Sequence, residues 1–98
     1  MVEYNRWIKD SLRKINRSAV PIFYDPHYMI REAERNLDVD LVEKAVRFGA
    51  PVYRKSTYPN RICFKMYFGK TKETYEVPVK LYKNFWEVKS AWKRKGRD

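Results

Sequence analysis

Alternation between apolar and polar side chains from Arg61 to Lys93 is the feature of this sequence that most constrains its fold. Successive side chains leave a strand on opposite sides, so alternation predicts strands with two different faces. One face is apolar: Ile62, Phe64, Met66, Phe68, Tyr75, Val77, Val79, Leu81, Trp86, Val88 and Trp92. The other face is basic and aromatic: Arg61, Lys65, Tyr67, Lys80, Tyr82, Phe85, Lys89 and Lys93. The apolar face requires a covering layer.

Turn signals divide this stretch into three strands, Arg61–Phe68, Glu73–Tyr82 and Phe85–Lys93. A register that places apolar residues opposite one another predicts these cross-strand partners: Phe68 with Glu73, Met66 with Tyr75, Phe64 with Val77, Ile62 with Val79, Arg61 with Lys80, Lys65 with Glu76, Lys80 with Glu87, and Tyr75 with Trp92. A slip of one residue would turn every apolar side chain to the wrong face. Pro78 has no amide donor, so we expect a bulge or a local break in pairing there.

Three helices are predicted before the strands. Residues 2–17 have apolar residues at helical spacing, and the opposite side is basic, with Arg6, Lys9, Arg13 and Arg17. Asp25 and Asp38 are expected to cap helices over residues 26–35 and 39–48, because Asp accepts hydrogen bonds from the free amides at a helix start. Gly49 is expected to end the last helix in a left-handed conformation.

These elements predict one α+β domain over residues 1–98. It has an amphipathic helix over residues 1–17, two short helices over 25–49, an antiparallel sheet of three to four strands over 52–93, and a basic tail over 94–98. The first strand is expected at residues 52–55. Residues 18–24 can hold a short extended piece, although Pro21 argues against a central strand. Because only one sheet face is apolar, we expect two to three helices to cover that face and the basic face to stay open.

The charge balance limits the partners. The chain has 22 Lys and Arg residues against 12 Asp and Glu residues, a formal net charge of +10. This excess favours a polyanion as partner, although a basic surface without a ligand is the alternative. No apolar run approaches the ~20 residues of a membrane span, and the charged N-terminal residues do not fit a signal peptide. The lone Cys63 cannot form an internal disulfide and fits a reducing cytoplasm. The absence of Gln beside many Lys, Arg and Glu residues is mildly thermophile-like.

The basic and aromatic face is suited to RNA or single-stranded nucleic acid, because Lys and Arg bind phosphates and flat rings stack on bases. The predicted binding residues are Arg61, Lys65, Tyr67, Lys80, Tyr82, Phe85, Lys89, Lys93 and Arg94. Arg61 opposite Lys80 is a like-charge pair that an anion would relieve, so these two residues are the centre of the predicted site. Glu76 and Glu87 neutralise part of the charge in this register. The alternative interpretation is a solvated face with cross-strand ion pairs.

Motifs for catalysis are missing from the sequence. It has no glycine-rich phosphate loop, no spacing typical of metal ligands and no serine–histidine pattern, so no metal or cofactor is predicted. His27 is a candidate general acid or base, against the alternative of an exposed or packed histidine. Cys63 is interpreted as a small strand residue. A metal-independent nuclease stays open, because Lys, Arg and Tyr side chains can stabilise phosphoryl charge.

One family likeness accompanies these patterns. His27, Arg31 and Arg35, spaced H-x-x-x-R-x-x-x-R and followed by Leu37, Val42 and Val46, resemble the helical opening of a widespread small domain of unknown function. The layout of residues 24–95 is similar to that of BrnT-type and RelE-type toxins, which are ribonucleases with helices packed on an antiparallel sheet. The resemblance implies that Arg61, Lys65 and Lys93 stabilise the scissile phosphate or the leaving oxygen. The terminal Tyr or His that such toxins often use has no counterpart after Trp92.

Three functions follow from these observations. The first is a small basic protein of the cytoplasm that binds RNA or single-stranded DNA. The second is a metal-independent ribonuclease of the toxin type. The third is a protein-interaction module in which Tyr67, Tyr82 and Phe85 form a surface for a homodimer or another protein, because aromatic residues are enriched in interface cores.

Overall fold

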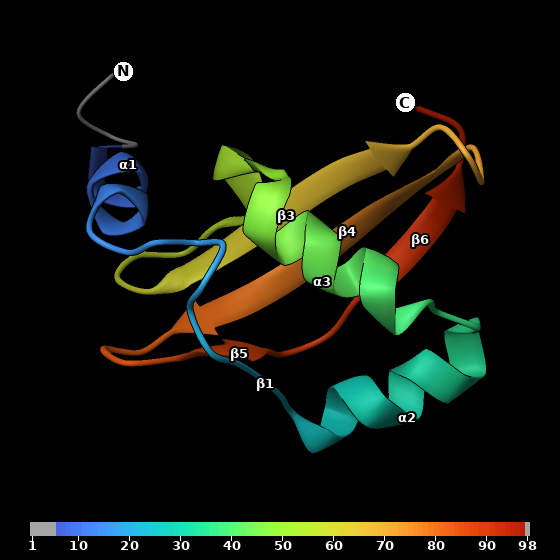
Figure 1. Ribbon diagram of the computed structural model, residues 1–98, viewed down its shortest axis with the longest axis horizontal. Coiled ribbons are helices and arrows are strands. Elements are labelled where there is room, and N and C mark those ends of the chain that lie inside the picture. The colour runs from blue at the N-terminus through green and yellow to red at the C-terminus, as the bar shows by residue number, and fades with distance from the viewer. Residues whose placement is uncertain (1–5, 98) are drawn as a thin grey trace.

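The computed structural model describes residues 6–97 and has an α+β fold (Figure 1). Within these residues it contains three helices, α1 (Arg6–Arg13), α2 (Pro26–Arg35) and α3 (Val39–Phe48), and a short 3-10 helix, η2 (Tyr53–Lys55). The six strands are β1 (Ile22–Tyr24), β2 (Ala50–Pro51), β3 (Arg61–Phe68), β4 (Glu73–Leu81), β5 (Trp86–Val88) and β6 (Trp92–Lys95). None of the helices in the described part of the chain combines the length and apolarity needed to cross a bilayer.

All strands belong to one sheet in the order β1-β5-β4-β3-β2, and β6 pairs with β4 beyond the end of β5. The prediction of a purely antiparallel sheet of three to four strands is wrong in two respects, because the described part of the chain has six strands in this sheet and β1 runs parallel to β5. Pro21 does not prevent this pairing. Its carbonyl accepts a hydrogen bond from the Trp86 amide at 2.9 Å, and β1 is an edge strand, where a missing donor is tolerated.

The starts of α2 and α3 confirm the predicted caps. The Asp25 side chain accepts a hydrogen bond from the His27 amide at 2.7 Å, and the Asp38 side chain accepts one from the Asp40 amide at 2.9 Å. Both helices have the predicted bounds, whereas α1 ends at Arg13, short of the predicted residue 17. Its predicted first residues, 2–5, lie outside the described part of the chain.

Residues 52–55 do not form the predicted strand. Strand β2 covers Ala50–Pro51, and residues 53–55 turn into η2. The cause is Ser56, whose hydroxyl donates to the Val52 carbonyl at 2.8 Å and accepts from the Cys63 amide at 3.1 Å. This hydroxyl takes the place of the next strand residue beside β3, so the ladder stops there.

The predicted register of β3 with β4 is confirmed at every position, and so is the pairing of Lys80 with Glu87. The register of β6 is wrong by one residue, because Tyr75 lies opposite Lys93 and Glu76 lies opposite Trp92. The shift arises beside Pro78, where the chain leaves β5 and the Lys89 amide donates to the Pro78 carbonyl at 3.0 Å. The break expected at Pro78 therefore affects the β5–β6 side only.

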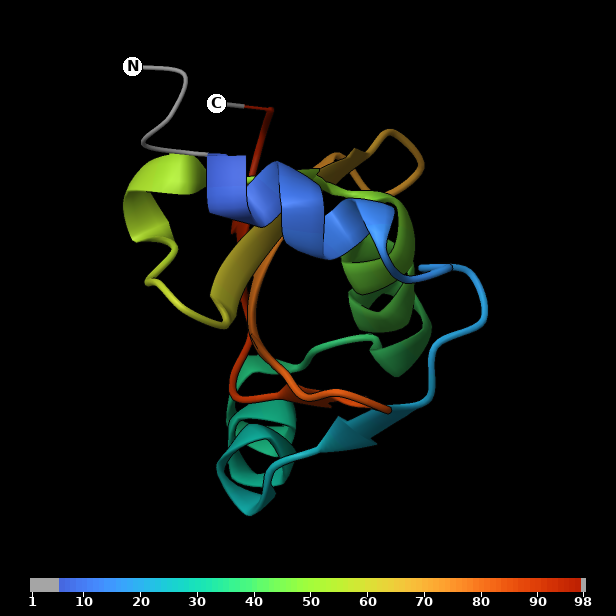
Figure 2. The same cartoon turned by 90° about the vertical axis from the view of Figure 1, so that its left-hand side faces the viewer.

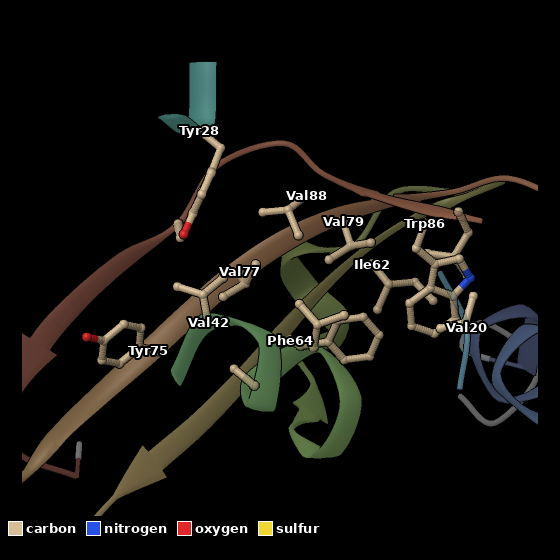
Figure 3. Close-up of a cluster of buried hydrophobic side chains, with 14 of the residues drawn as sticks. Val20, Tyr28, Val42, Ile62, Phe64, Tyr75, Val77, Val79, Trp86 and Val88 are labelled. Carbon is tan, nitrogen blue, oxygen red and sulfur yellow. The ribbon is translucent and has the colours of Figure 1, made fainter. Parts of the chain in front are cut away.

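The core lies between α3 and the face of the sheet that we call the inner face. Figure 2 shows α3 on one side of β3 and β4 and residues 53–60 on the other. Helix α3 contributes Val42, Ala45 and Val46, none of which has exposed surface. The predicted inward residues of β3, β4 and β5 meet them, as Figure 3 shows for Ile62, Phe64, Tyr75, Val77, Val79, Trp86 and Val88.

Candidate nucleic-acid interface

The opposite side of the sheet, which we call the outer face, is covered at its centre. Cys63 and Thr74 are each 1% exposed and Glu76 is 2% exposed. Lys55, from η2, reaches across to Glu76. The prediction of a wholly open basic face is therefore wrong, because the segment that was expected to form a strand folds over it. The outer face is more accessible at the end that carries Arg61, which is exposed, and Lys80 and Glu87, which are partly exposed.

Glu76 is held by an ion-pair network at this covered centre. Its carboxylate accepts a hydrogen bond from Lys55 Nζ at 2.7 Å, and Arg94 Nη1 lies 2.6 Å from its other oxygen. Burial raises the pKa of Glu76, but the hydrogen bonds from Lys55 and Arg94 outweigh burial and leave the pKa below its usual value. Glu76 is thus a charged structural residue.

The thiol of Cys63 lies beside this network, with Sγ 3.9 Å from a Glu76 oxygen. Burial, and next the charge of Glu76, raises the pKa of Cys63 to about 11. A thiol with such a pKa stays protonated near neutral pH, and the thiolate is the nucleophilic form. This environment agrees with the interpretation of Cys63 as a small strand residue.

Four residues form a row across the accessible end of the outer face. The registers place Phe23 beside Glu87, Glu87 beside Lys80, and Lys80 beside Arg61, on β1, β5, β4 and β3 respectively. We call these four residues the outer row. Neighbouring strands lie about 4.8 Å apart, so the row extends over about 14 Å. The backbone of Arg61 is fixed by two hydrogen bonds with Thr57, at 2.7 and 2.9 Å.

The ring of Phe23, at one end of the outer row, belongs to a group of three aromatic rings, Phe23, Tyr82 and Phe85, which we call the ring cluster. The rings of Tyr82 and Phe85 are stacked at 4.7 Å, and the ring of Phe23 meets that of Phe85 edge-on at 5.4 Å. The turn between β4 and β5 positions the stacked pair, because the Tyr82 amide donates to the Phe85 carbonyl at 2.9 Å. Lys80 Nζ lies 5.3 Å from the centre of the Tyr82 ring.

Glu87, the acidic member of the outer row, makes its ion pair with Lys89 and not with the two cations of the row. Glu87 lies 3.4 Å from Lys89 Nζ, and Lys89 makes a shorter bond of 2.7 Å to Asp25. The hydrogen bond from Lys89 lowers the pKa of Asp25. Within residues 6–97, neither Arg61 nor Lys80 forms an ion pair. Glu87 thus lies opposite Lys80, as predicted, but the two side chains do not form an ion pair.

The remaining predicted binding residues lie elsewhere. Lys65 lies opposite Glu76 at the covered centre, where Arg94 is bound to Glu76. Tyr67 lies toward the far end of the outer face, where the Arg97 guanidinium lies 4.5 Å from the centre of its ring. Lys89 is bound to Asp25. The structure thus brings together Arg61, Lys80, Tyr82 and Phe85 out of the predicted set.

Lys93 is on the inner face, contrary to prediction, because the register of β6 is shifted. Its Nζ donates to the Asn36 carbonyl at 2.9 Å and lies 3.4 Å from a Glu73 oxygen. Trp92 is correspondingly not a core residue. It is opposite Glu76 on the outer face, with Lys55 Nζ 5.5 Å from its ring. The set Arg61, Lys65 and Lys93, which the toxin resemblance implies, is consequently divided between the two faces.

Arg17 is also placed differently from the prediction of a basic helix stripe. Its guanidinium donates to the carbonyls of Val46 and Gly49, at 2.7 and 2.9 Å, and lies 4.5 Å from the centre of the Phe64 ring. Burial lowers the pKa of Arg17. This residue therefore caps the end of α3. The other cations of the predicted stripe line a hollow of about 380 Å³ on α1 with Asp10: Arg6, Lys9 and Arg13.

Phe23 is the residue of the accessible end that the sequence interpretation missed. Its side chain is 58% exposed, and its neighbours Ile22 and Tyr24 face the core. The alternation of Ile22, Phe23 and Tyr24 was a usable signal for an outward ring. The position of that ring depends on the parallel pairing with β5, which no local pattern specifies.

Residues typical of catalysis or metal binding do not converge at this site. His27 is exposed at the start of α2, and its backbone amide completes the helix cap. In the part of the chain that the structure describes, no three His, Cys, Asp or Glu side chains form a group that could hold a metal ion. The arrangement offers cations, rings and one carboxylate for binding.

Comparisons of the chain with protein-family models, with curated proteins and with solved structures gave no significant match. The likeness to BrnT-type and RelE-type toxins accordingly stays a prediction.

Proposed function

We propose that this protein binds single-stranded nucleic acid, with RNA favoured, at the accessible end of its outer face. The observation that supports the proposal most directly is the like-charge pair of Arg61 and Lys80 beside the ring cluster. Like charges directly opposite each other on a sheet destabilise it, and a phosphate between them would reverse this effect.

The ring cluster supports a single strand over a duplex. Bases within a duplex are stacked on one another, so their faces are not available to protein rings, whereas unpaired bases stack on aromatic side chains. Stacking contributes roughly 1–3 kcal/mol per base. Cations for the phosphates and a ring for the base lie within one short row, which is the combination that binding of a single strand requires.

Binding is measured by fluorescence anisotropy with labelled single-stranded RNA, single-stranded DNA and duplex, over a range of salt concentrations. Each phosphate contact on a single strand contributes about 0.7 to the slope of log affinity against log salt. Changing Arg61→Ala together with Lys80→Ala is expected to reduce that slope by about 1.4.

The matched control is Lys44→Ala together with Lys70→Ala, which removes the same charge from α3 and from the far β3–β4 turn. We expect this control to keep most of the affinity. Absence of binding by the unchanged protein at low salt would contradict the proposal. Equal losses in the two double variants would show that only the overall charge matters.

A ribonuclease with a RelE-like fold is an alternative proposal, derived from the sequence resemblance. The division of Arg61 and Lys65 from Lys93 does not favour it. The binding samples are run on a denaturing gel without added metal. Shortened RNA that disappears with Arg61→Ala or Lys65→Ala would support cleavage.

A protein-interaction surface is a second candidate, favoured by the exposed edge strand β1. Phe23, Met29 and Ile30, on β1 and α2, are all more than half exposed. A strand at a sheet edge has backbone groups that can pair with another chain. Light scattering tests it, because a mass of two chains that reverts with Phe23→Asp would indicate self-association at β1.

The reduced, buried Cys63 is compatible with action in the cytoplasm.

A further inference from the structure

We infer that Glu87 makes this site selective for bases with an exocyclic amino group, so that the protein binds cytosine in preference to uracil. The inference rests on the proposed function and concerns the same site. It assigns different roles to the members of the outer row: Phe23 stacks on the base, Glu87 contacts its edge, and Lys80 and Arg61 bind phosphate.

Phe23 has the most accessible ring of the ring cluster. It is 58% exposed, whereas Tyr82 and Phe85 are half-buried and stacked on each other at 4.7 Å. Lys80 additionally lies near the Tyr82 ring at 5.3 Å. Phe85, on which Tyr82 is stacked, thus supports the ring of Phe23, and a base has the free surface of Phe23 on which to stack.

Glu87 lies between this ring and the cations. It is beside Phe23 on one side and Lys80 on the other, and its side chain is 23% exposed. Its contact with Lys89, at 3.4 Å, is longer than the 2.7 Å bond between Lys89 and Asp25. An ionised carboxylate has about four sites for hydrogen-bond donors. Glu87 consequently retains acceptor capacity toward a ligand.

A carboxylate at this position repels a phosphate group, but it can accept a hydrogen bond from the edge of a base. The sequence of groups along the row is ring, carboxylate, cation and cation. A base stacked on Phe23 can direct its amino edge to Glu87, and because that edge points away from the base's own sugar, Lys80 and Arg61 would bind phosphates of neighbouring nucleotides in the strand. Cytosine has an amino group, a donor, where uracil has a carbonyl oxygen, an acceptor. Glu87 can accept a hydrogen bond from cytosine, and it repels the uracil oxygen.

Short labelled oligoribonucleotides of cytidine alone and of uridine alone test this inference, because the two bases have nearly the same shape. Affinities are measured by anisotropy at one low salt concentration and slightly alkaline pH. We expect the unchanged protein to bind the cytidine oligomer roughly tenfold more tightly, the discrimination that one good polar base contact gives. Phe23→Ala is expected to weaken binding of both oligomers.

Glu87→Gln separates recognition of the base from electrostatic attraction. The amide can donate to uracil as well as accept from cytosine, and it removes one negative charge from the row. We expect affinity for the uridine oligomer to rise and the preference for cytidine to disappear. The control Glu34→Gln removes an exposed carboxylate from α2, where it pairs with Arg31, and should keep the preference.

The results distinguish this inference from the proposed function. Binding of both oligomers with equal affinity would overturn the role of Glu87 and leave the proposed function in place. A preference that persists in Glu87→Gln would also overturn it. If neither oligomer binds, the proposed function fails and the inference fails with it. Circular dichroism of each variant confirms that a change in affinity does not arise from unfolding.

Discussion

Glu76 is a buried carboxylate at the middle of the outer face, and its two cationic partners are partly exposed. Lys55 and Arg94 are 39% and 31% exposed, while the Glu76 side chain is 3% exposed. Glu76→Gln removes the charge that both cations contact. We expect it to lower the free energy of unfolding by about 2 kcal/mol, the range for hydrogen bonds to charged groups. Urea denaturation measures the loss, and Glu34→Gln, at an exposed pair, should change stability by less than about 0.5 kcal/mol.

The pH dependence of stability provides the control for this interpretation. The pKa of Glu76 is lowered in the folded protein, because the hydrogen bonds from Lys55 and Arg94 outweigh the opposing effect of burial. A lowered pKa stabilises the fold above the unfolded pKa, and this contribution is lost as the pH falls through the folded pKa. Below about pH 4.3, the usual value for glutamate, the difference between the unchanged protein and Glu76→Gln should therefore shrink. A constant difference would contradict an ionised Glu76.

Individual cations show why the net charge does not locate a site. Arg17 caps α3, Arg47 donates to the carbonyls of Arg17 and Val20, and Arg35 donates to the Ala91 carbonyl. These contacts join segments far apart in the sequence. A basic residue on the polar side of a helix pattern thus has two outcomes, solvent or a backbone carbonyl, and the sequence pattern does not distinguish them.

At the scale of elements, Gly49 sets the distance between α3 and β3. Its φ of −76° is not left-handed, contrary to prediction, so conformational freedom is not the reason for a glycine here. An added Cβ would lie 2.4 Å from the Ala45 oxygen and 2.7 Å from the Lys65 oxygen. Gly49→Ala is therefore expected to destabilise the protein by about 2 kcal/mol, as overpacking does.

Gly69→Ala is the matched control for this prediction. A Cβ at Gly69 would lie 4.0 Å from an atom of the Tyr67 ring, an ordinary contact. We expect a change below about 0.5 kcal/mol at this surface position. Thermal unfolding of both variants measures the contrast. Similar losses in the two variants would show that the close approach at Gly49 is not the cause.

The elements also show how far local patterns determine this fold. The register of β3 with β4 was predictable because one face is buried, so a slip would expose the core. The position of β6 was not, because the break beside Pro78 adds one residue and exchanges the faces of Trp92 and Lys93. The pairing of β1 with β5 joins segments more than sixty positions apart. Two features of the candidate site were therefore not predictable from local patterns. The position of Phe23 depends on the pairing of β1 with β5, and the absence of Lys93 from the outer face depends on the register of β6.

At the scale of the whole molecule, the cations that give the formal charge of +10 have different surroundings. Lys55, Lys89, Lys93 and Arg94 are bound to acidic side chains, and Arg17 is bound to carbonyls. Arg61 and Lys80 lie opposite each other without an ion pair to any residue from 6 to 97. We therefore expect the excess charge to have a local consequence at the outer row, where two like charges directly opposite each other make the fold less stable than a neutral pair would.

Salt should relieve this local repulsion in the absence of nucleic acid. Salt screens exposed charges, with a Debye length of about 10 Å at 0.1 M. Arg61→Ala with Lys80→Ala should raise the melting temperature at low salt more than Lys44→Ala with Lys70→Ala does, because only the first pair of residues is directly opposed. Raising the salt concentration should reduce the difference between the two double variants. Differential scanning fluorimetry measures both effects. If the difference in melting temperature between the two double variants does not depend on salt, it arises from packing and not from charge repulsion. If the difference does depend on salt, repulsion between Arg61 and Lys80 destabilises the protein without a ligand. A phosphate bound between these two residues would then remove the repulsion and stabilise the fold.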